Sequence, residues 1–169
     1  MGLDASGARR RRGFTLTELA VVIVVLGTLA VVAYPRLADL GVFSLHAASR
    51  RLAGDLNHAK NLAMSRRVAC GVAFAPALDA YTVFVGTPAT PAPDPQRPDR
   101  PLRVDLAAAG VDLASASFGG GAEVRFDPLG QPLDAAGQPF TARGRVVLAH
   151  GAERDTVTVD AFSGGVRGP

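Results

Sequence analysis

The first apolar segment of the chain runs over residues 14–34, and Glu18 is its only charged residue. A helix of this length rises about 30 Å at about 1.5 Å per residue, which equals the thickness of the hydrocarbon core of a membrane. The pattern therefore predicts a helix over residues 14–34 that crosses a membrane once. A charged side chain inside lipid is costly, so Glu18 is expected to have a partner.

A second pattern begins beyond Pro35 and predicts an amphipathic helix over about residues 44–66, extending back toward Pro35. Its apolar positions recur at steps of three and four, at Leu45, Ala48, Leu52, Leu56, Ala59, Leu62 and Ala63. Gly27 weakens a helix by about 1 kcal/mol, and Pro35 removes a backbone hydrogen bond, so a kink between them is expected. A helix that simply ends at residue 34 is the alternative.

After residue 67 the period changes from helical to strand-like. Short β-rich runs are predicted over residues 68–74, 81–85, 102–106, 111–116, 122–126, 143–149, 156–161 and 166–167. The six prolines within residues 87–101 exclude a central strand there and predict an exposed loop. The chain is thus predicted to have an α+β fold, in which residues 35–67 form a helix packed on an antiparallel sheet domain of residues 68–169.

Charge is concentrated at the start of the chain. The formal net charge is +3, but four arginines lie at positions 9–12. Without residues 1–13, acidic and basic side chains balance, so the basic character belongs to the leader. Basic residues before an apolar helix place residues 1–12 in the cytoplasm and the C-terminal domain outside it. A cleaved secretory signal is the rival interpretation, but Glu18 does not suit its apolar region.

The junction between the arginines and the apolar helix resembles the type III signal of type IV prepilins and type II secretion pseudopilins. The residues that carry this resemblance are Gly13-Phe14-Thr15-Leu16-Thr17-Glu18-Leu19. It implies that a prepilin peptidase cuts between Gly13 and Phe14, removing leader residues 1–13, and that Phe14 becomes N-methylated. Glu18 would then pair with the Phe14 ammonium of a neighbouring subunit during assembly, and Gly27 and Pro35 match the positions that weaken pilin helices.

The order of a long helix and an antiparallel sheet, with Phe126 and Gly130 midway and residues 163–167 at the end, resembles the GspH/FimT family of minor pseudopilins and minor pilins. This resemblance implies a pilin-like fold and a minor pseudopilin of the type II secretion system. The implied partners are other pseudopilins or pilins, contacted through the N-terminal helix, the prepilin peptidase and the inner membrane. The implied location is the inner membrane, with a single span and a periplasmic domain.

The alternative within this resemblance is a FimT/FimU-like minor type IV pilin that acts in pilus assembly or DNA uptake. DNA-binding members carry a Gly-Arg-x-Arg motif near the C-terminus, and residues 164–167 and 144–147 each lack one of its arginines. Residues 68–169 also carry more acidic than basic side chains, so nucleic acid is not an expected partner. The candidates for a DNA contact are Arg143, Arg145 and Arg167.

Residue patterns typical of catalysis are absent from the sequence, so we expect no enzyme, no cofactor and no metal. His150 has no cysteine or second histidine nearby that could complete a zinc site. His46 and His58 are interpreted as ordinary helix surface or boundary residues, and Glu153 and Asp155 as solvated residues of a hairpin turn. The single cysteine, Cys70, is predicted to be buried in a strand.

Overall fold

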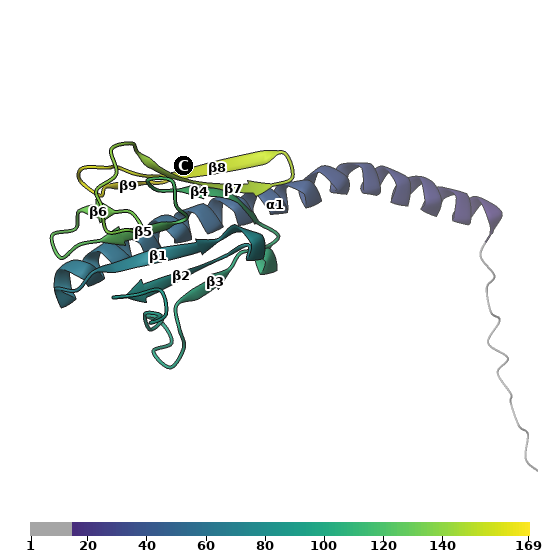
Figure 1. The fold of residues 1–169 in the computed structure, drawn as a ribbon. Coiled ribbons are helices and arrows are strands. Elements are labelled where there is room, and N and C mark those ends of the chain that lie inside the picture. The colour runs from purple at the N-terminus through teal and green to yellow at the C-terminus, as the bar shows by residue number, and fades with distance from the viewer. Residues whose placement is uncertain (1–14) are drawn as a thin grey trace, which may run out of the picture. The chain divides into compact units, whose positions relative to one another are not determined.

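The computed structural model describes residues 15–169, except for the side chains of residues 31–41 (Figure 1). Backbone contacts divide the chain into two compact units, Met1–Ala38 and Asp39–Pro169. The helix α1 is assigned to Leu16–Arg66 and so belongs to both units. The second unit holds the short 3-10 helices η1 (Pro76–Leu78) and η2 (Ala107–Ala109) and the strands β1 (Cys70–Ala75), β2 (Ala80–Val85), β3 (Arg103–Asp105), β4 (Asp112–Ser117), β5 (Glu123–Phe126), β6 (Pro132–Leu133), β7 (Gly144–His150), β8 (Glu153–Val159) and β9 (Val166–Arg167).

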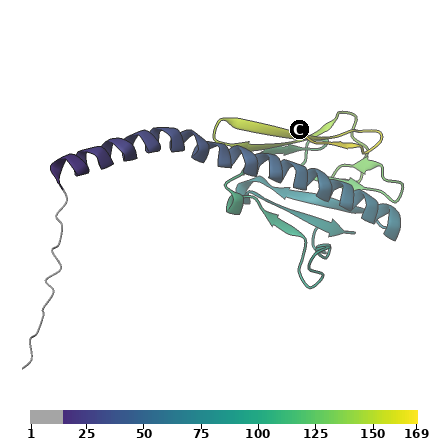
Figure 2. The ribbon, with the colours of Figure 1, turned by 180° about the vertical axis from the view of Figure 1, so that it is seen from behind.

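The strands form two antiparallel sheets. One has the order β3-β2-β1-β5-β6, and the other has the order β4-β7-β8-β9. Figures 1 and 2 show that both sheets lie against the same side of the C-terminal part of α1. The predicted α+β fold, a helix on antiparallel sheets, is therefore confirmed.

One stripe of α1 provides the helical side of the core. Its members recur at three- and four-residue steps, which keeps them on one face of a helix. They are Leu45, Ala48, Leu52, Leu56, Ala59 and Ala63, and all are buried. Val72, Phe126, Val146, Leu148 and Val157, from both sheets, belong to the same buried cluster. The period of the sequence thus correctly identified the buried face of this helix.

Close packing against the neighbouring strand requires glycine at one position of β1. A methyl group at Gly71 would collide with the Val124 carbonyl oxygen and would lie 2.7 Å from Phe84 Cζ. Because the first of these is a backbone atom in the paired strand β5, no change of rotamer can make room. Gly71 therefore allows β1 to pair with β2 and β5 at the same time.

The hairpin near the C-terminus differs from its prediction. A connection over residues 150–155 was expected, but β7 and β8 pair as far as His150 and Glu153, which leaves only Gly151 and Ala152 in the turn. Gly151 adopts a φ of 59°, a conformation that glycine tolerates best. The polar residues Glu153 and Asp155 therefore belong to a strand, because alternation along β8 matters more than their turn propensity.

The proline-rich segment lies along an edge of the larger sheet. The Ala92 N–H donates to the Val83 carbonyl oxygen at 2.8 Å, and the Leu102 N–H donates to the Ala92 carbonyl oxygen at 2.7 Å. Ala92 is fully buried, although its neighbours Pro91 and Pro93 are exposed. Prolines here leave few free N–H groups, which limits pairing of the edge with another strand.

Candidate functional site

Within the described residues 15–30, other side chains do not cover the helix of the first unit. Every described residue from 15 to 30 is exposed, including the large apolar side chains of Leu16, Leu19, Ile23 and Leu26. A helix that is apolar on all sides normally lies in the core of an assembly or in a membrane. Among the described residues, no helix combines the length and the apolar character needed to cross a membrane.

Glu18 lies in the first turn of α1 and takes part in its cap. The Glu18 N–H donates to Thr15 Oγ1 at 3.2 Å, and the Leu19 N–H donates to the Thr15 carbonyl oxygen at 3.1 Å. Thr15 followed three positions later by glutamate is the sequence of a capping box, and a carboxylate near a helix N-terminus is favoured by the helix dipole. Sequence reasoning missed this local role, although the spacing Thr-x-x-Glu could have indicated it.

Of the other residues predicted to act in this region, Gly27 lies within the fully described part of the chain. Gly13 and Phe14 lie outside the described residues, as does the side chain of Pro35. A methyl group at Gly27 would have no atom within 4 Å, so nothing nearby requires glycine there. The kink at Gly27 and Pro35 stays a prediction.

A buried carboxylate joins α1 to the smaller sheet. Asp155 Oδ2 accepts a hydrogen bond from Ser49 Oγ at 2.8 Å and lies 2.8 Å from His46 Nδ1. Asp155 and Ser49 are buried, whereas the His46 side chain is 45% exposed. The interpretation of Asp155 as a solvated turn residue was therefore wrong, and His46 is a contact residue. Ser49 bonds the carboxylate and not the imidazole, so this group is a structural link and not a nucleophile–base pair.

A second carboxylate joins α1 to the larger sheet. The Tyr81 hydroxyl donates to Asp55 Oδ2 at 2.7 Å, and Arg51 Nε lies 3.8 Å from the same oxygen. Burial raises the pKa of the Asp55 carboxyl, although the bond from Tyr81 and the charge of Arg51 oppose this. Burial also raises the pKa of Tyr81, which keeps its hydroxyl a donor.

Lys60 makes the third link from α1. Its Nζ donates to the Ser163 carbonyl oxygen at 2.7 Å and to that of Gly164 at 3.3 Å. The loop that carries these carbonyls is closed by Asp160, whose Oδ1 accepts from the Ser163 N–H at 3.0 Å and from its hydroxyl at 2.9 Å. The hydrogen bond from the Ser163 N–H is the main cause that lowers the pKa of the Asp160 carboxyl. The helix thus holds both sheets and their last loop.

Two successive turns in the second unit have the same construction. Asp127 Oδ1 accepts from the N–H groups of Leu129 and Gln131, each at 2.8 Å. Asp134 Oδ1 accepts in the same way from Ala136 at 2.9 Å and from Gln138 at 2.8 Å. Both turns have the sequence Asp-x-x-Gly-Gln-Pro. The repeat of this motif after seven residues is a sequence signal for both turns.

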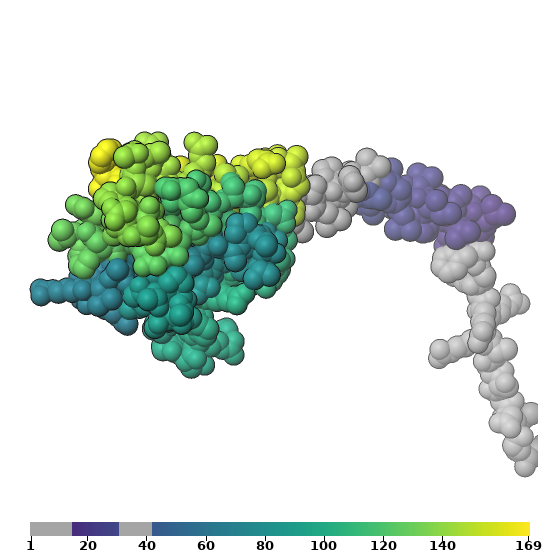
Figure 3. Space-filling view, viewed as in Figure 1, coloured from purple at the N-terminus to yellow at the C-terminus, as the bar shows by residue number. Residues whose placement is uncertain are grey.

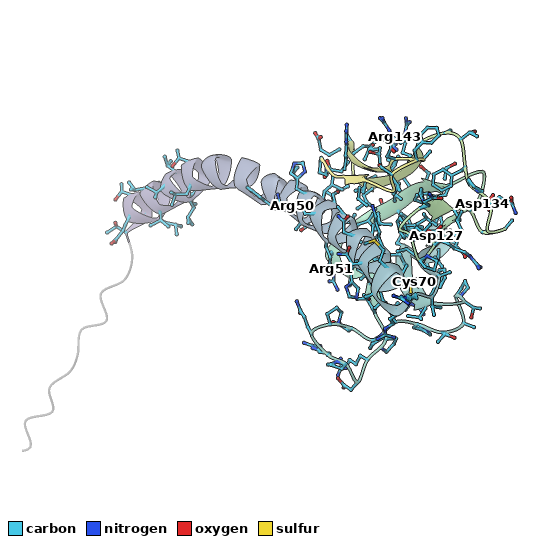
Figure 4. All side chains as sticks on the ribbon, turned by 90° about the vertical axis from the view of Figure 1, so that its left-hand side faces the viewer. Arg50, Arg51, Cys70, Asp127, Asp134 and Arg143 are labelled. Atoms are coloured by element: carbon cyan, nitrogen blue, oxygen red, sulfur yellow. The ribbon has the colours of Figure 1, made fainter. Side chains whose placement is uncertain are left out.

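The structure brings together two of the three candidate arginines for DNA contact. Arg145 of β7 and Arg167 of β9 both pair with Thr158 of β8, so they stand in one row across the exposed face of the smaller sheet. Two strand spacings separate them by about 10 Å. Arg143 precedes β7, is exposed, and its charge contributes to the lowered pKa of Asp160 (Figure 4).

The remaining polar candidates form no recognisable reactive group. His150 Nδ1 lies 2.6 Å from the Gly110 carbonyl oxygen. Cys70 is buried in β1, as predicted, and burial raises the pKa of its thiol. Within the described part of the chain, no three side chains of the metal-binding types His, Cys, Asp and Glu cluster closely enough to hold a metal ion.

Comparison with known proteins adds two family matches. The family described as "Type II transport protein GspH" matches residues 48–165, and the one described as "Prokaryotic N-terminal methylation motif" matches residues 8–34. No curated protein matches the chain.

Two crystal structures of the type IV minor pilin FimU from Pseudomonas aeruginosa have a similar fold. The first has a TM-score of 0.51 and 16% identity over 74% of this chain and 87% of that chain. The second has a TM-score of 0.50 and 14% identity over 74% of this chain and 92% of that chain. At such identities the likeness is one of fold alone.

Proposed function

The chain belongs to the family of type II transport protein GspH, a structural and non-enzymatic family, and on that premise we propose that it is a minor pseudopilin of the type II secretion pseudopilus. In this proposal, the N-terminal helix packs against the helices of other pseudopilins. The filament would lie in the periplasm and assist the export of folded proteins. The observation that carries the proposal is the helix over residues 15–30, which is apolar and exposed on every side.

The N-terminal residues are proposed to direct processing and location. The match to a methylation motif over residues 8–34 supports cleavage between Gly13 and Phe14, followed by N-methylation of Phe14. Before assembly the chain would be held in the inner membrane by residues 14–34, with the second unit in the periplasm. N-terminal sequencing and intact-mass measurement of the purified protein test this. A mature chain that begins anywhere other than Phe14 contradicts the proposal.

Glu18 is proposed to be the assembly residue. Its carboxylate would pair with the Phe14 ammonium of a neighbouring subunit, which compensates two desolvated charges at once. The observed bond to Thr15 Oγ1 uses the backbone N–H of Glu18, so the competing and purely local role of its side chain is that of the capping-box carboxylate at the helix N-terminus. Glu18→Gln separates the two, because glutamine can still serve a capping box but carries no charge.

The experiment compares Glu18→Gln, Glu18→Val and the wild type for membrane insertion, for recovery with other pseudopilins in sheared filaments, and for secretion. Under the proposal both variants insert and fold, but both are depleted from filaments. Depletion of Glu18→Val alone assigns the effect to the cap. Normal recovery of both variants refutes the assembly role.

A second candidate function, a minor type IV pilin that contacts DNA, is favoured by one observation. Arg145 and Arg167 flank Thr158 on an exposed sheet face, and Arg143 lies at the start of the same sheet. Two arginines about 10 Å apart on a flat face can contact phosphates of the same DNA together, and a single arginine cannot. Gel-shift titration of the detergent-solubilised full chain, with Arg145→Ala/Arg167→Ala and with the matched surface variant Arg97→Ala/Arg100→Ala, tests it. Salt-sensitive binding that only the first pair abolishes supports this function.

A further inference from the structure

Three hollows follow one another along one flank of α1 in the second unit. Their volumes are about 260 Å³, 310 Å³ and 210 Å³ in the direction of the chain. Arg51 lines both the first and the second hollow, and Asp94 and Pro95 line both the second and the third. The hollows therefore form one groove, which follows α1 from Ser44 to Arg66 over about 33 Å.

The lining of this groove changes along its length. The first hollow is formed on α1 by Ser44, Ala47, Ala48 and Arg51, and on the opposite wall by Val104, Asp105, Leu106 and Ala109. The second hollow is formed by Arg51, Asp55, Asp94, Pro95, Gln96 and Leu102. The third is formed on α1 by His58, Leu62 and Arg66, and on the opposite wall by Pro93, Asp94, Pro95 and Pro98. Apolar and proline side chains thus form most of the first and third hollows, whereas charged and amide side chains form most of the second.

The proline-rich segment forms a folded wall opposite α1. The Asp94 N–H donates to the Arg100 carbonyl oxygen at 2.9 Å, and the Arg97 N–H donates to the Asp94 carbonyl oxygen at 3.1 Å. Asp94 Oδ1 also accepts from the Gln96 N–H at 2.8 Å. Figure 3 shows that the segment between β2 and β3 protrudes at the lower side of the second unit. Because this wall is already ordered, less conformational entropy is lost when a partner binds.

The charges of the groove favour a basic group in its middle. Arg51 Nε lies 3.8 Å from Asp55 Oδ2, whereas Asp94, Asp105 and Arg66 form no ion pair within the described residues. The second hollow therefore holds two carboxylates against one guanidinium. Burial, with a smaller contribution from the charge of Asp94, raises the pKa of the Asp55 carboxyl. At the two ends of the groove, Asp105 and Arg66 are exposed, so water screens their charges.

The spacing of the hollows suits a helix. Ala48 lines the first hollow, Asp55 the second and Leu62 the third, and these residues are seven positions apart on α1, about 10.5 Å each. A second helix that lies along α1 presents its own positions i, i+7 and i+14 on one face at the same spacing. Apolar side chains at the outer two positions and a basic side chain at the middle position match the three hollows.

We propose that this groove binds a helix of another pseudopilin, which carries an apolar side chain at position i, a lysine or arginine at i+7 and an apolar side chain at i+14. The basic side chain faces Asp94 and Asp55. The inference rests on the proposed function, because the neighbours of a minor subunit are mainly other pseudopilins. A second copy is the rival occupant, since Leu29, Arg36 and Phe43 of the present chain also have this spacing.

Photo-crosslinking of the full chain in cells that assemble the filament tests the contact. The photoreactive residue p-benzoylphenylalanine replaces Gln96, which is exposed and lines the second hollow. The expected adduct joins the chain to a helix of another pseudopilin, within about one turn of a basic residue that has apolar residues seven positions before and after it. The same replacement at Gln138 is the control, because Gln138 is an exposed glutamine that lines none of the three hollows.

Charge substitutions give a second readout. Asp94→Asn keeps an acceptor for the Gln96 N–H but removes the charge, and it is expected to reduce the adduct at position 96 several-fold. Asp99→Asn, in the same loop but outside the groove, is the matched control and should leave the yield unchanged. Asp94→Lys should abolish the adduct, and replacing the mapped basic residue of the partner by glutamate should restore it. Circular dichroism should show the same fold for all variants.

Several results would overturn the proposal. They are an adduct with a second copy of this chain or with a protein that is not a pseudopilin, equal yields at positions 96 and 138, and an unchanged yield in Asp94→Asn. Recovery of the chain in sheared filaments is scored in the same cells. Normal recovery without an adduct at position 96 refutes the groove contact alone, whereas absence of the chain from filaments refutes the pseudopilin function as well.

Discussion

Ser49 and Asp155, 106 positions apart in the sequence, are joined by a hydrogen bond of 2.8 Å between the middle of α1 and the smaller sheet. Both residues are buried, and His46 lies against the same carboxylate oxygen. In the proposed filament, the helix would need firm attachment to the domain that it supports. Asp155, Asp55 and Lys60 provide three such attachments at successive levels of the helix.

Removing the Asp155 carboxylate should destabilise the second unit. Asp155→Ala leaves the buried Ser49 hydroxyl without its acceptor, which costs about 1–3 kcal/mol of unfolding free energy. The expected result is a lower thermal midpoint in circular dichroism, with a smaller loss for His46→Ala because that side chain is half-exposed. Glu153→Ala, at the exposed start of the same strand, is the control and should change stability little. Equal midpoints for the Asp155 and Glu153 variants would contradict this assignment.

The raised pKa of Asp55 predicts a pH dependence of stability. In the folded chain, burial raises the pKa of this carboxyl above its ordinary value, so the folded state binds the proton more tightly than the unfolded state does. The contribution of Asp55 to stability is therefore greatest below about pH 3.9, the pKa expected in the unfolded chain, and falls as pH rises through the folded pKa. Asp55→Asn should remove this contribution while keeping an acceptor for the Tyr81 hydroxyl.

The measurement is the difference in thermal midpoint between the wild type and Asp55→Asn across acidic pH. The wild type should lose stability relative to the variant as pH increases. A difference that stays constant, or that grows in favour of the wild type, would show that the Arg51 interaction outweighs burial.

Gly71→Ala should strongly destabilise the sheet domain. The added methyl group would meet the backbone of β5 and the ring of Phe84, and overpacking of this kind costs about 1–3 kcal/mol. Gly54→Ala is the matched comparison, because a methyl group there has no atom within 4 Å and the position is an exposed helix interior. That variant should gain about 0.5–1 kcal/mol. Denaturant unfolding of both variants tests whether the free energy of unfolding falls in Gly71→Ala and rises in Gly54→Ala.

The first of the two repeated turns should depend on its aspartate. Asp127→Ala removes the acceptor of two backbone N–H groups, and we expect a loss of about 1–2 kcal/mol in unfolding free energy. Asp127→Asn keeps an acceptor oxygen and should lose less. Asp99→Ala is the control. Asp99 is exposed, and its Oδ2 lies 3.9 Å from Arg100 Nε, which is a long and exposed ion pair of little energetic weight. Amide hydrogen exchange at Leu129 and Gln131 should increase in the alanine variant alone.

Several features of the fold could be predicted from the sequence because they depend on the pattern of residues that are close together in the chain. The three- and four-residue period of α1 identified Leu45, Leu52 and Leu56 as buried, and alternation identified most strands. The short strand β6 was missed, since Pro132 argues against a strand even though an edge position tolerates it. The order of strands in two sheets was not predicted, because strand order is set by long-range pairing.

The sequence by itself determined the N-terminal signal and the family, since both depend on residues that are neighbours in the chain or that recur with a fixed period. Tertiary structure alone decided which polar residues act together. Asp155 has the sequence context of a turn residue, yet strand pairing carries it into the interior, where a buried carboxylate must find Ser49 and His46.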